Sequence, residues 1–528
     1  MLLNSYLGSK GYTISKNELT IEKQKQIRND LTIKPFVMGS PMNDNQKTFP
    51  AYRESINKFY VPHYYGIENF GPPKQYKINE GTDINLEFAG ILRDYQEPVV
   101  NKFIHHCDDV KYGGGLLELP CAWGKTSASL YILSKLKKKA LVIVHKEFLM
   151  NQWIERIQQF LPKARVGKIQ GQIIDIDDKD IVIGMLQSLS MKEYPASTFE
   201  SFGLTIIDEV HHISSEVFSN SLFKLVTKYM LGLSATMNRK DGTTKVFKMF
   251  LGEVIFKGKR DEPMNVIVHA IKYEVDDEEF NEVKLDYRGN PAYSSMISKL
   301  CEYNRRSEFI LKVLSNMLET NPNQQIMLLA HNKNVLKYLH DSIQHRNIAT
   351  VGYYVGGMKE KALKETETKK IVIATFSMAA EALDIKTLTT LIMVTPKTDI
   401  EQSVGRILRE KHSNPIVVDI IDSHELFQNQ WRKRKTFYKK ENYKIIYTAS
   451  SSYTSDTSKW QTLFTPNQNG KKECTIKKIT KKSISERSNS STDKSITNDS
   501  DVEEDEEEIQ DKPKDKYLTG KCLLQFKK

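Results

Sequence analysis

Residues 116–130 read LLELPCAWGKTSASL. The apolar run LLEL is followed by a turn and then by a segment that favours a helix, so Gly124, Lys125 and Thr126 stand where a strand passes into a helix. At such a turn, backbone amides point at phosphates, a lysine neutralises the β and γ groups, and a threonine hydroxyl reaches magnesium. The stretch therefore predicts a loop that binds a nucleoside triphosphate with Mg²⁺.

This loop departs from the common pattern GxxxxGK[ST], because Leu119 stands where the first glycine is expected. A GKT triplet that occurs by chance at a helix start is the alternative interpretation. If the loop does bind phosphate, its nucleotide-binding residues are Leu119, Pro120, Cys121, Ala122, Trp123, Gly124, Lys125 and Thr126.

A second segment, LTIIDEVHH at 204–212, is an apolar strand that ends in Asp208 and Glu209. Ligands bind at the edge formed by the carboxyl ends of parallel strands. Because metal binding and base catalysis need separate carboxylates, we expect Asp208 to hold magnesium through water and Glu209 to orient and deprotonate the attacking water. His211 is then expected to relay the state of the nucleotide. A solvated helix cap is the alternative interpretation of this acidic pair.

The apolar runs fall in two blocks, near 116–235 and 326–422, with helix-like segments between them. Short, continuously apolar runs are typical of buried parallel strands. We therefore predict an α/β protein with two tandem domains, each built on a parallel sheet. The expected parts are an accessory region at 1–85, a first domain at 86–252, a connector or inserted lobe at 253–305, a second domain at 306–447 and a disordered, low-complexity tail at 448–528.

The segment QSVGRILRE at 402–410 carries Arg406 and Arg409 at a spacing of three. On a helix, this spacing places both guanidinium groups on one face. If the second domain packs over the first, the two arginines can reach the γ-phosphate and stabilise the charge of the transition state. Two arginines on a solvated helix are the alternative interpretation.

The composition limits the class of protein. Of the 528 residues, 39% are hydrophobic and 27% are charged, which is typical of a globular chain. The formal net charge of +11 favours a polyanionic partner, since basic clusters release counterions from phosphates. Neither an apolar run of roughly 20 residues nor a secretory signal is present, so we expect a soluble, intracellular protein with no membrane partner. The five cysteines form no CxxC pair, which argues against disulfides and structural zinc.

Taken in order, these motifs resemble those of the superfamily 2 helicases over about residues 90–445. LRDYQ at 92–96 is similar to the upstream element of that family, PCAWGKT to motif I and DEVH to motif II. The SAT triplet at 234–236 is similar to motif III, ATFSMAAEALDI at 374–385 to motif V, and QSVGRILR to motif VI. The resemblance implies two tandem RecA-like domains of the P-loop NTPase fold, with ATP as the nucleotide and Mg²⁺ as its metal.

The same resemblance assigns further site residues. It places Gln96 at the adenine edge and Arg93 or Tyr95 in the base pocket. It assigns Asp384 to nucleotide binding and Gln402 to catalysis beside the two arginines. Coupling of hydrolysis to movement is assigned to Ser234, Ala235 and Thr236.

Within that family, LRDYQ, SATMNRKDG at 234–242 and QNQWRKRKTFYKK at 428–440 resemble the branch that contains the xeroderma pigmentosum group B helicase. The aromatic and proline-rich leader looks most like poxvirus transcript-release helicases and their giant-virus relatives. The resemblance implies a virus-encoded enzyme that acts on nucleic acid, with DNA favoured and RNA possible, in transcription or repair. It implies the cytoplasmic replication site of a host, or the virion, as its location.

Two positions depart from the pattern of that family, because Ala122 and Ala382 stand where glycine is common. Alanine disfavours left-handed backbone angles, so activity requires that position 122 does not need a positive φ. Two alternatives stay open. One is a DExH-type RNA helicase, and the other is a nucleic-acid-binding scaffold that keeps the fold without turnover.

The segment QNQWRKRKTFYKK interleaves aromatic and basic residues, a mixture that can bind a phosphate backbone and stack on bases. We expect Arg432 and Arg434 to contact nucleic acid. A solvated helix with a buried aromatic stripe is the alternative interpretation. Beyond residue 448 the chain is rich in Ser, Thr, Lys and Asn, with too little apolar surface to fold, and this tail is a candidate for contacting RNA polymerase or other transcription proteins.

Overall fold

The computed structural model of the protein describes residues 4–36, 48–109, 113–120, 123–212, 215–237, 242–258, 265–381, 383, 385–410 and 412–466. The chain forms two compact units. The first comprises Met1–Ile267, Ser377–Leu391 and Asp399–Ile416, and the second comprises Val268–Phe376, Ile392–Thr398 and Val417–Lys528. The predicted site residues Cys121, Ala122 and Asp384, the departure at Ala382 and the tail beyond residue 466 lie outside the described residues.

The first unit is built on an eight-stranded sheet with the strand order β11-β10-β12-β9-β13-β14-β8-β15. Adjacent strands are parallel, except that β10 and β11 pair in the antiparallel direction. This sheet confirms the predicted α/β architecture. Its strands are β8 (Gly114–Glu118), β9 (Ala140–Val144), β10 (Val166–Gln170), β11 (Ile173–Ile174), β12 (Ile181–Met185), β13 (Leu204–Ile207), β14 (Tyr229–Ser234) and β15 (Val254–Lys257).

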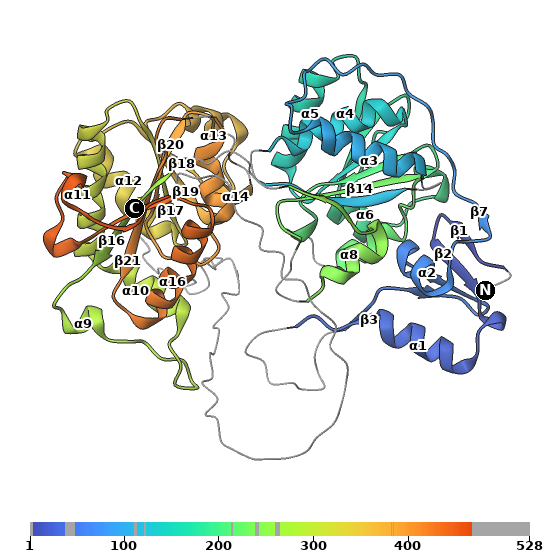
Figure 1. The fold of residues 1–528 in the computed structure, drawn as a ribbon, viewed down its shortest axis with the longest axis horizontal. Coiled ribbons are helices and arrows are strands. Elements are labelled where there is room, and N and C mark those ends of the chain that lie inside the picture. The colour runs from blue at the N-terminus through green and yellow to red at the C-terminus, as the bar shows by residue number, and fades with distance from the viewer. Residues whose placement is uncertain are drawn as a thin grey trace, which may run out of the picture. The chain divides into compact units, whose positions relative to one another are not determined.

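Helices cover both faces of this sheet, with α3, α4 and α5 on one face and α6 and α8 on the other (Figure 1). The strands are apolar on both sides, since Leu117 of β8 packs into the cluster under α4 and α5, while Leu116 packs into the cluster under α6, α7 and α8. Such strands read as continuous apolar runs. The helices are α3 (Glu97–Asp109), α4 (Lys125–Leu136), α5 (Glu147–Phe160), α6 (Leu186–Met191), α7 (Ser215–Leu222) and α8 (Thr244–Leu251).

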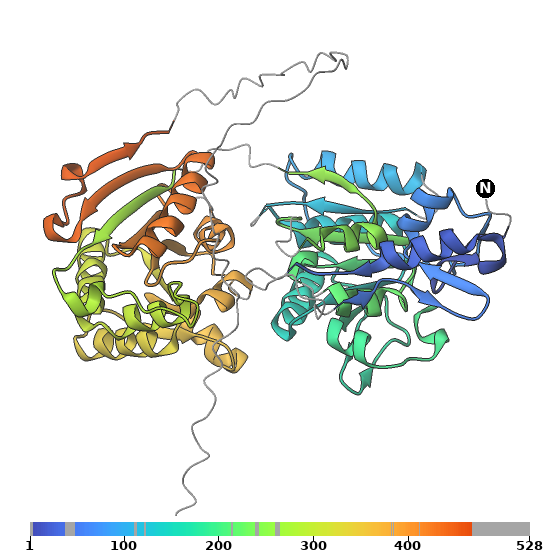
Figure 2. The ribbon, with the colours of Figure 1, turned by 90° about the horizontal axis from the view of Figure 1, so that it is seen from below.

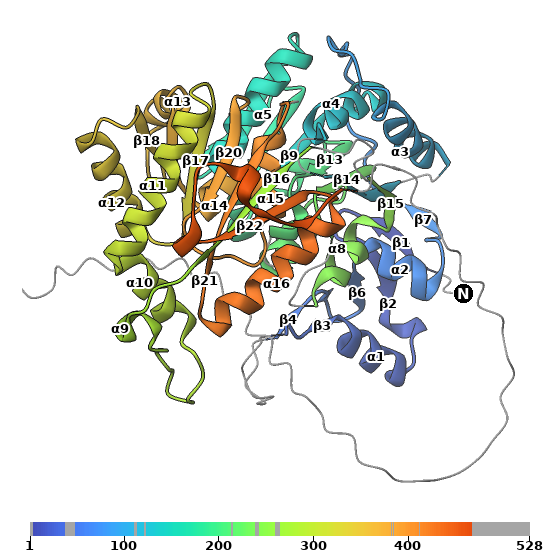
Figure 3. The ribbon, with the colours of Figure 1, turned by 60° about the vertical axis from the view of Figure 1, so that its left-hand side comes forward.

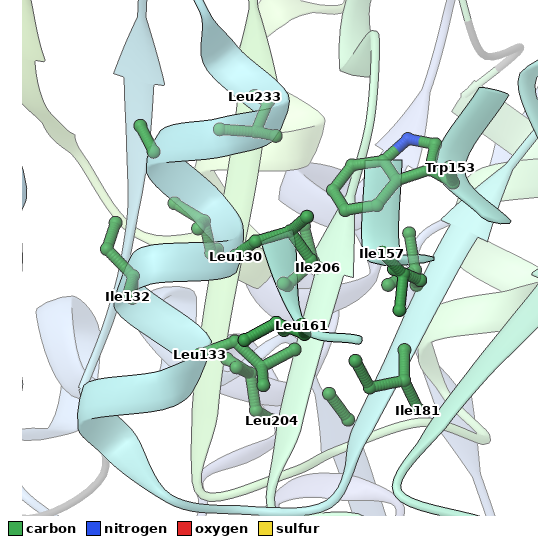
Figure 4. Close-up of a cluster of buried hydrophobic side chains, with 14 of the residues drawn as sticks. Leu130, Ile132, Leu133, Trp153, Ile157, Leu161, Ile181, Leu204, Ile206 and Leu233 are labelled. Atoms are coloured by element: carbon green, nitrogen blue, oxygen red, sulfur yellow. The ribbon is translucent and has the colours of Figure 1, made fainter. Parts of the chain in front are cut away.

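The core under α4 and α5 determines where the phosphate loop and the acidic strand end lie. Leu130 and Leu133 of α4 meet Ile206 of β13, and Trp153 and Ile157 of α5 close the cluster (Figure 4). Each of these side chains is at most 1% exposed. Burial of one such side chain contributes roughly 1.5–3 kcal/mol, so the cluster holds α4 and α5 firmly against β13.

The amino-terminal region, whose fold is not predicted from the sequence, contains a five-stranded sheet of order β5-β6-β2-β1-β7. This region is the dark blue segment beside the N label in Figure 2. Phe59, Tyr12 and Leu7 of this sheet pack on Ile27 and Leu31. The region contacts the first large sheet, where the Tyr64 hydroxyl donates to the carbonyl of Gly114 at 3.0 Å. Its elements are β1 (Tyr6–Gly8), β2 (Gly11–Ser15), α1 (Ile21–Leu31), β3 (Thr32–Ile33), β4 (Phe49–Pro50), β5 (Arg53–Glu54), β6 (Lys58–Val61), α2 (His63–Phe70) and β7 (Gln75–Tyr76).

A second eight-stranded sheet has the order β18-β19-β17-β20-β21-β16-β22-β23. Strand β19 pairs in parallel with both β17 and β18, as predicted for this block, whereas β22 and β23 are antiparallel. The strands are β16 (Ile267–Tyr273), β17 (Gln325–Ala330), β18 (Val351–Tyr354), β19 (Ile371–Thr375), β20 (Leu388–Met393), β21 (Ile416–Asp422), β22 (Lys444–Ala449) and β23 (Gln461–Phe464).

Helices α10, α11 and α12 lie side by side, and α12 packs against β17, β18 and β19 (Figure 3). Helix α16 packs against β22. The helices are α9 (Glu278–Asn281), α10 (Tyr293–Glu302), α11 (Asn304–Thr320), α12 (Lys333–His345), α13 (Glu360–Glu367), α14 (Phe376–Glu381), α15 (Glu401–Gly405) and α16 (Glu425–Lys440). Among the described residues, no helix combines the length and the apolar character needed to cross a bilayer.

Two segments differ from the ranges expected from the sequence. Residues 253–305 were expected to form a connector or an inserted lobe, but β15 joins the first sheet and β16 joins the second. Strand β16 mixes buried and half-buried residues, and this pattern is difficult to recognise in the sequence beside the charged segment that follows. The tail was expected to lack structure from residue 448, yet β23 pairs with β22 and Trp460 is 7% exposed. A few apolar side chains therefore extend the second sheet into a polar segment.

Candidate nucleotide site

Strand β8 delivers the phosphate loop to the start of α4. The amide of Leu119 donates to the carbonyl of Ser234 at 2.8 Å, which ties the loop to the end of β14. The side chain of Leu119 is 0% exposed and that of Trp123 is 6% exposed, and both belong to the core. Both side chains face the core, so only the backbone groups of Leu119 and Trp123 are available to a nucleotide, and their role in nucleotide binding stays a prediction.

Gly124 shows why the GKT triplet needs its glycine. Its φ is +91°, a left-handed conformation at the cap of α4. A Cβ at this position would lie 2.4 Å from Nε2 of Gln96, so the Gln96 side chain would have to shift. The backbone angle therefore requires glycine here. Lys125 and Thr126 follow in the first turn of α4, where the helix amino terminus favours negative charge.

The upstream element LRDYQ lies against this loop. Gln96 is 2% exposed and donates from Nε2 to the carbonyl of Trp123 at 3.0 Å. Its Oε1 accepts from the amide of Arg93 at 2.9 Å, so the side-chain amide is held in one orientation. The ring of Tyr95 lies 5.4 Å from that of Trp123, and the Arg93 guanidinium donates to the Tyr95 hydroxyl. The predicted base-pocket residues thus gather beside the phosphate loop.

The acidic pair stands at the carboxyl end of β13, separated from β8 only by β14. Nζ of Lys125 lies 2.6 Å from Oε1 of Glu209, with the two side chains 13% and 21% exposed. Glu209 has a φ of +48°, which a residue with a side chain rarely adopts. The structure therefore brings together the lysine of the GKT triplet and the acid of DEVH, as the sequence predicts.

Asp208 is more deeply placed than Glu209 and is 7% exposed. Its Oδ2 accepts from the indole Nε1 of Trp153 at 2.9 Å, and its Oδ1 accepts from the amide of Glu209 at 3.0 Å. Burial raises the pKa of Asp208, and the charge of Glu209 raises it further, while Lys125 opposes both effects. A nearby cation would favour the ionised carboxylate, which suits a metal ligand.

His211 connects the acidic pair to two other predicted residues. Its Nδ1 lies 2.6 Å from Oγ of Ser234 and 3.4 Å from Oε2 of Glu209. Its Nε2 lies 3.0 Å from Nε2 of Gln402, which belongs to the same compact unit. The Ser234 hydroxyl also accepts from the amide of Thr236 at 3.2 Å. Ser234 and Thr236 are therefore joined to His211 by hydrogen bonds, His211 contacts Glu209, and Ala235 is 6% exposed.

Arg406 and Arg409 follow α15, where the helix tightens to a 3-10 turn over Arg406–Leu408. In such a turn, residues three apart lie on one side, as predicted for the two arginines. Arg406 is 7% exposed and donates from Nη1 to the carbonyl of Leu383 at 2.8 Å, while Arg409 is half-buried. Their approach to a nucleotide stays a prediction.

Several known proteins are similar to this chain. Residues 90–239 match the family described as "Type III restriction enzyme, res subunit". The chain is 35% identical over 448 residues to "Putative ATP-dependent RNA helicase L396" of Acanthamoeba polyphaga mimivirus. The aligned region covers 82% of this chain and 85% of that protein. It is 27% identical over 396 residues to "Putative ATP-dependent RNA helicase QP509L" of African swine fever virus (isolate Pig/Kenya/KEN-50/1950), over 70% of this chain and 76% of that protein.

The chain belongs to the superfamily 2 helicases. It is an ATP-hydrolysing enzyme with two RecA-like domains, as the order of its motifs predicts. A solved structure of the Hef helicase domain of Pyrococcus furiosus aligns with a TM-score of 0.44 at 13% identity, over 65% of this chain and 98% of that chain.

The site of this helicase suits ATP with magnesium. Gly124 leaves the space beside Gln96 that a side chain would fill, and Lys125 starts a helix. Within the described ranges, no group of three or more His, Cys, Asp or Glu side chains could hold a metal. Mg²⁺ keeps several waters and binds few protein oxygens directly, so the Thr126 hydroxyl suits direct binding and the Asp208 carboxylate suits its waters.

One predicted contact of the helicase with nucleic acid is wrong. Arg434 is 0% exposed, and its Nε and Nη2 donate to Asp419 at 2.8 and 2.9 Å, so it cannot reach a backbone phosphate. Trp431 and Tyr438 are 8% and 0% exposed, so the aromatic stripe of α16 is part of the core. Arg432 is exposed and stays a candidate. The alternative interpretation, a solvated helix with a buried aromatic stripe, describes most of this segment.

Trp153 contacts Asp208 directly, yet no motif in the sequence points to it. A buried tryptophan needs an acceptor for its indole N–H, and that requirement is the only signal that could have pointed to it. The acceptor lies 55 residues away along the chain, so the partner could not be named from the pattern.

Proposed function

We propose that this helicase uses ATP hydrolysis to move along DNA, in viral transcription, including termination or transcript release, or in repair. One observation supports it above the others. Lys125 and the two carboxylates of DEVH meet at one edge of a parallel sheet, with Lys125 already paired to Glu209 at 2.6 Å. The pair is 13% and 21% exposed, so phosphate oxygens can reach it.

In the proposed cycle, the phosphates of ATP compete with Glu209 for Lys125. Once Lys125 binds the β and γ phosphates, Glu209 is released to accept a hydrogen bond from the attacking water and to take its proton. Thr126, and Asp208 through water, would hold magnesium, which would supply positive charge beside the phosphates. Arg406 and Arg409 stabilise the remaining charge when they approach the γ-phosphate.

His211 then transmits the nucleotide state of the site to the neighbouring motifs. This imidazole contacts Glu209, Ser234 and Gln402, so a change at Glu209 alters the hydrogen bonds of two other motifs. Gln402 lies four residues before Arg406 in the same segment. We therefore propose that hydrolysis shifts the segment that carries the arginines, and that this shift moves the enzyme along the nucleic acid.

The choice of DNA is supported by LRDYQ and SATMNRKDG, which resemble the branch that contains the xeroderma pigmentosum group B helicase. Steady-state ATP turnover should be measured without nucleic acid and with single-stranded DNA, duplex DNA or RNA at one salt concentration. We expect DNA to stimulate turnover more than RNA does. Stimulation by RNA alone would contradict the choice of DNA and leave the ATPase intact.

An RNA helicase is the second candidate, because the relatives from mimivirus and African swine fever virus are both named RNA helicases. A scaffold without turnover is the remaining alternative, suggested by Leu119 and Ala122 in the phosphate loop. Equal background rates in the wild type and in Lys125→Ala would favour that scaffold.

A contact of α16 with nucleic acid is proposed only for its exposed side chains. Arg432→Glu should weaken binding to nucleic acid and flatten its dependence on salt, since one phosphate contact is replaced by repulsion. Fluorescence anisotropy of a labelled oligonucleotide between low and moderate salt measures both effects. An unchanged salt slope would exclude this helix from the binding surface.

A further inference from the structure

Trp153 occupies the boundary between the core of the first sheet and the nucleotide site. Its ring lies among apolar side chains of α4, α5 and β13, with the indole nitrogen on the side away from Ile157 and Ile206 (Figure 4). The side chain is 1% exposed, so water cannot serve as its hydrogen-bond partner. The partner is Oδ2 of Asp208 at 2.9 Å.

The two oxygens of Asp208 are held by different donors. Oδ2 accepts from the indole of α5, while Oδ1 accepts from the amide of Glu209 at 3.0 Å. Two donors from separate elements fix the rotation of the carboxylate about its side-chain bonds. Each carboxylate oxygen has a second lone pair, with which it can accept a hydrogen bond from a water molecule.

We propose that Trp153 is a positioning residue for Asp208, holding its carboxylate in the orientation that binds the water shell of nucleotide-bound magnesium. This inference rests on the proposed role of Asp208, which is to hold magnesium through water. Groups that hydrogen-bond to a metal ligand orient it, and their loss commonly weakens metal binding. An indole suits this purpose because it only donates, and because its rings are fixed by the core around them.

The competing explanation is that Asp208 merely satisfies the indole N–H of a structural tryptophan. The two explanations differ in what magnesium does for nucleotide binding. A positioning role makes the magnesium-dependent part of nucleotide affinity sensitive to Trp153. A structural role alone leaves that part unchanged, or weakens binding equally with and without the metal.

The test compares the full-length wild type with Trp153→Phe and Ile157→Val. The second variant is the control, because Ile157 lies one turn later on α5, is 0% exposed and loses only a methyl group. The affinity of each protein for a fluorescent ADP analogue is measured with excess Mg²⁺ and with EDTA. The ratio of the two affinities is the readout, and it does not depend on turnover.

We expect Trp153→Phe to lower this ratio by roughly tenfold, with the affinity in EDTA unchanged. Ile157→Val should keep the ratio of the wild type. The Mg²⁺ concentration that gives half-maximal ATP turnover should rise in parallel for Trp153→Phe alone.

If Trp153→Phe does not fold, position 153 can carry β-3-benzothienylalanine, which keeps both fused rings and replaces the N–H by sulfur. An unchanged ratio in either variant would overturn the inference, as would an equal loss of affinity with and without Mg²⁺. A wild type whose nucleotide affinity does not respond to Mg²⁺ at all would instead refute the proposed metal role of Asp208, and the inference with it.

Discussion

Each of the two units contains an ion pair, and the two pairs differ in how far they are exposed to solvent. In the first unit, Lys125 and Glu209 share one contact at 2.6 Å and are 13% and 21% exposed. In the second, Arg434 and Asp419 share two hydrogen bonds at 2.8 and 2.9 Å and are 0% and 1% exposed. A polar ligand can displace a partner in the first pair and cannot reach the second. Exposure and geometry, rather than charge, therefore separate a site for chemistry from a fixed element of the fold.

The largest effect should come from removing one partner of the buried pair. Arg434→Met leaves the Asp419 carboxylate in the core, where the Tyr438 hydroxyl at 3.0 Å is the one remaining side-chain donor among the described parts of the chain. A lone buried charge costs about 4 kcal/mol, which should appear as a lower free energy of unfolding in urea. Adding Asp419→Leu should restore most of this loss. The control is Arg432→Met, two residues earlier and exposed, which should change stability by less than about 0.5 kcal/mol.

The corresponding change in the first unit should affect activity and spare stability. Lys125→Ala removes the cation that binds the phosphates, and ATP turnover should fall by about 100-fold, equivalent to about 2.7 kcal/mol in the activation barrier. Because Glu209 is 21% exposed, water can replace Lys125, and the unfolding free energy should change by less than about 1 kcal/mol. Turnover and urea unfolding of one preparation measure both. A loss of stability as large as that of Arg434→Met would show that the two pairs do not differ.

His63 provides a third case, a buried side chain that is neutral rather than paired with an opposite charge. His63 begins α2, is 7% exposed, and burial lowers its pKa to about 4. An unfolded histidine titrates near pH 6.5, so the stability that neutral His63 provides is complete above that pH and is lost as the pH falls toward 4. Between pH 7.5 and 5, the wild type should lose about 2 kcal/mol more unfolding free energy than His63→Phe does. Parallel losses in the two proteins would contradict the lowered pKa.

The large sheets could be predicted because their strands are buried on both faces. ALVIV, IVIGM and LTII are continuous apolar runs, and they are strands β9, β12 and β13 with the same bounds. Strand β16 was missed, because His269 and Lys272 interrupt its apolar character. The amino-terminal sheet could not be predicted, since its strands are only two to five residues long.

The site was predictable to the extent that its chemistry is local in the sequence. Lys125 follows one strand, and Asp208 and Glu209 follow another. Because the carboxyl ends of parallel strands lie at one edge of the sheet, the fold alone brings these residues together. Burial is not local in this sense. Arg434 was assigned to nucleic acid because nothing in QNQWRKRKTFYKK shows that its guanidinium forms an ion pair with Asp419, 15 residues earlier. Trp153 could not be selected for the same reason, because Asp208 lies 55 residues away along the chain.

The smallest effect should come from a pair that repeats the buried geometry at the surface. Arg346 donates from Nη1 and Nη2 to Glu308 at 2.8 and 2.7 Å, and the Tyr338 hydroxyl donates to the same carboxylate at 2.6 Å. Arg346 and then Tyr338 lower the pKa of Glu308, so this stabilisation is lost as the pH falls.

The side chains of Arg346 and Glu308 are 44% and 41% exposed, so solvent screens their attraction. Arg346→Met should therefore lower the unfolding free energy by less than about 1 kcal/mol, and 1 M salt should remove most of the difference. Urea unfolding of this variant beside Arg434→Met, at low and high salt, isolates burial as the variable, since both arginines face a carboxylate and a tyrosine. A cost at Arg346 close to that at Arg434, insensitive to salt, would mean that the paired geometry rather than burial sets the energy.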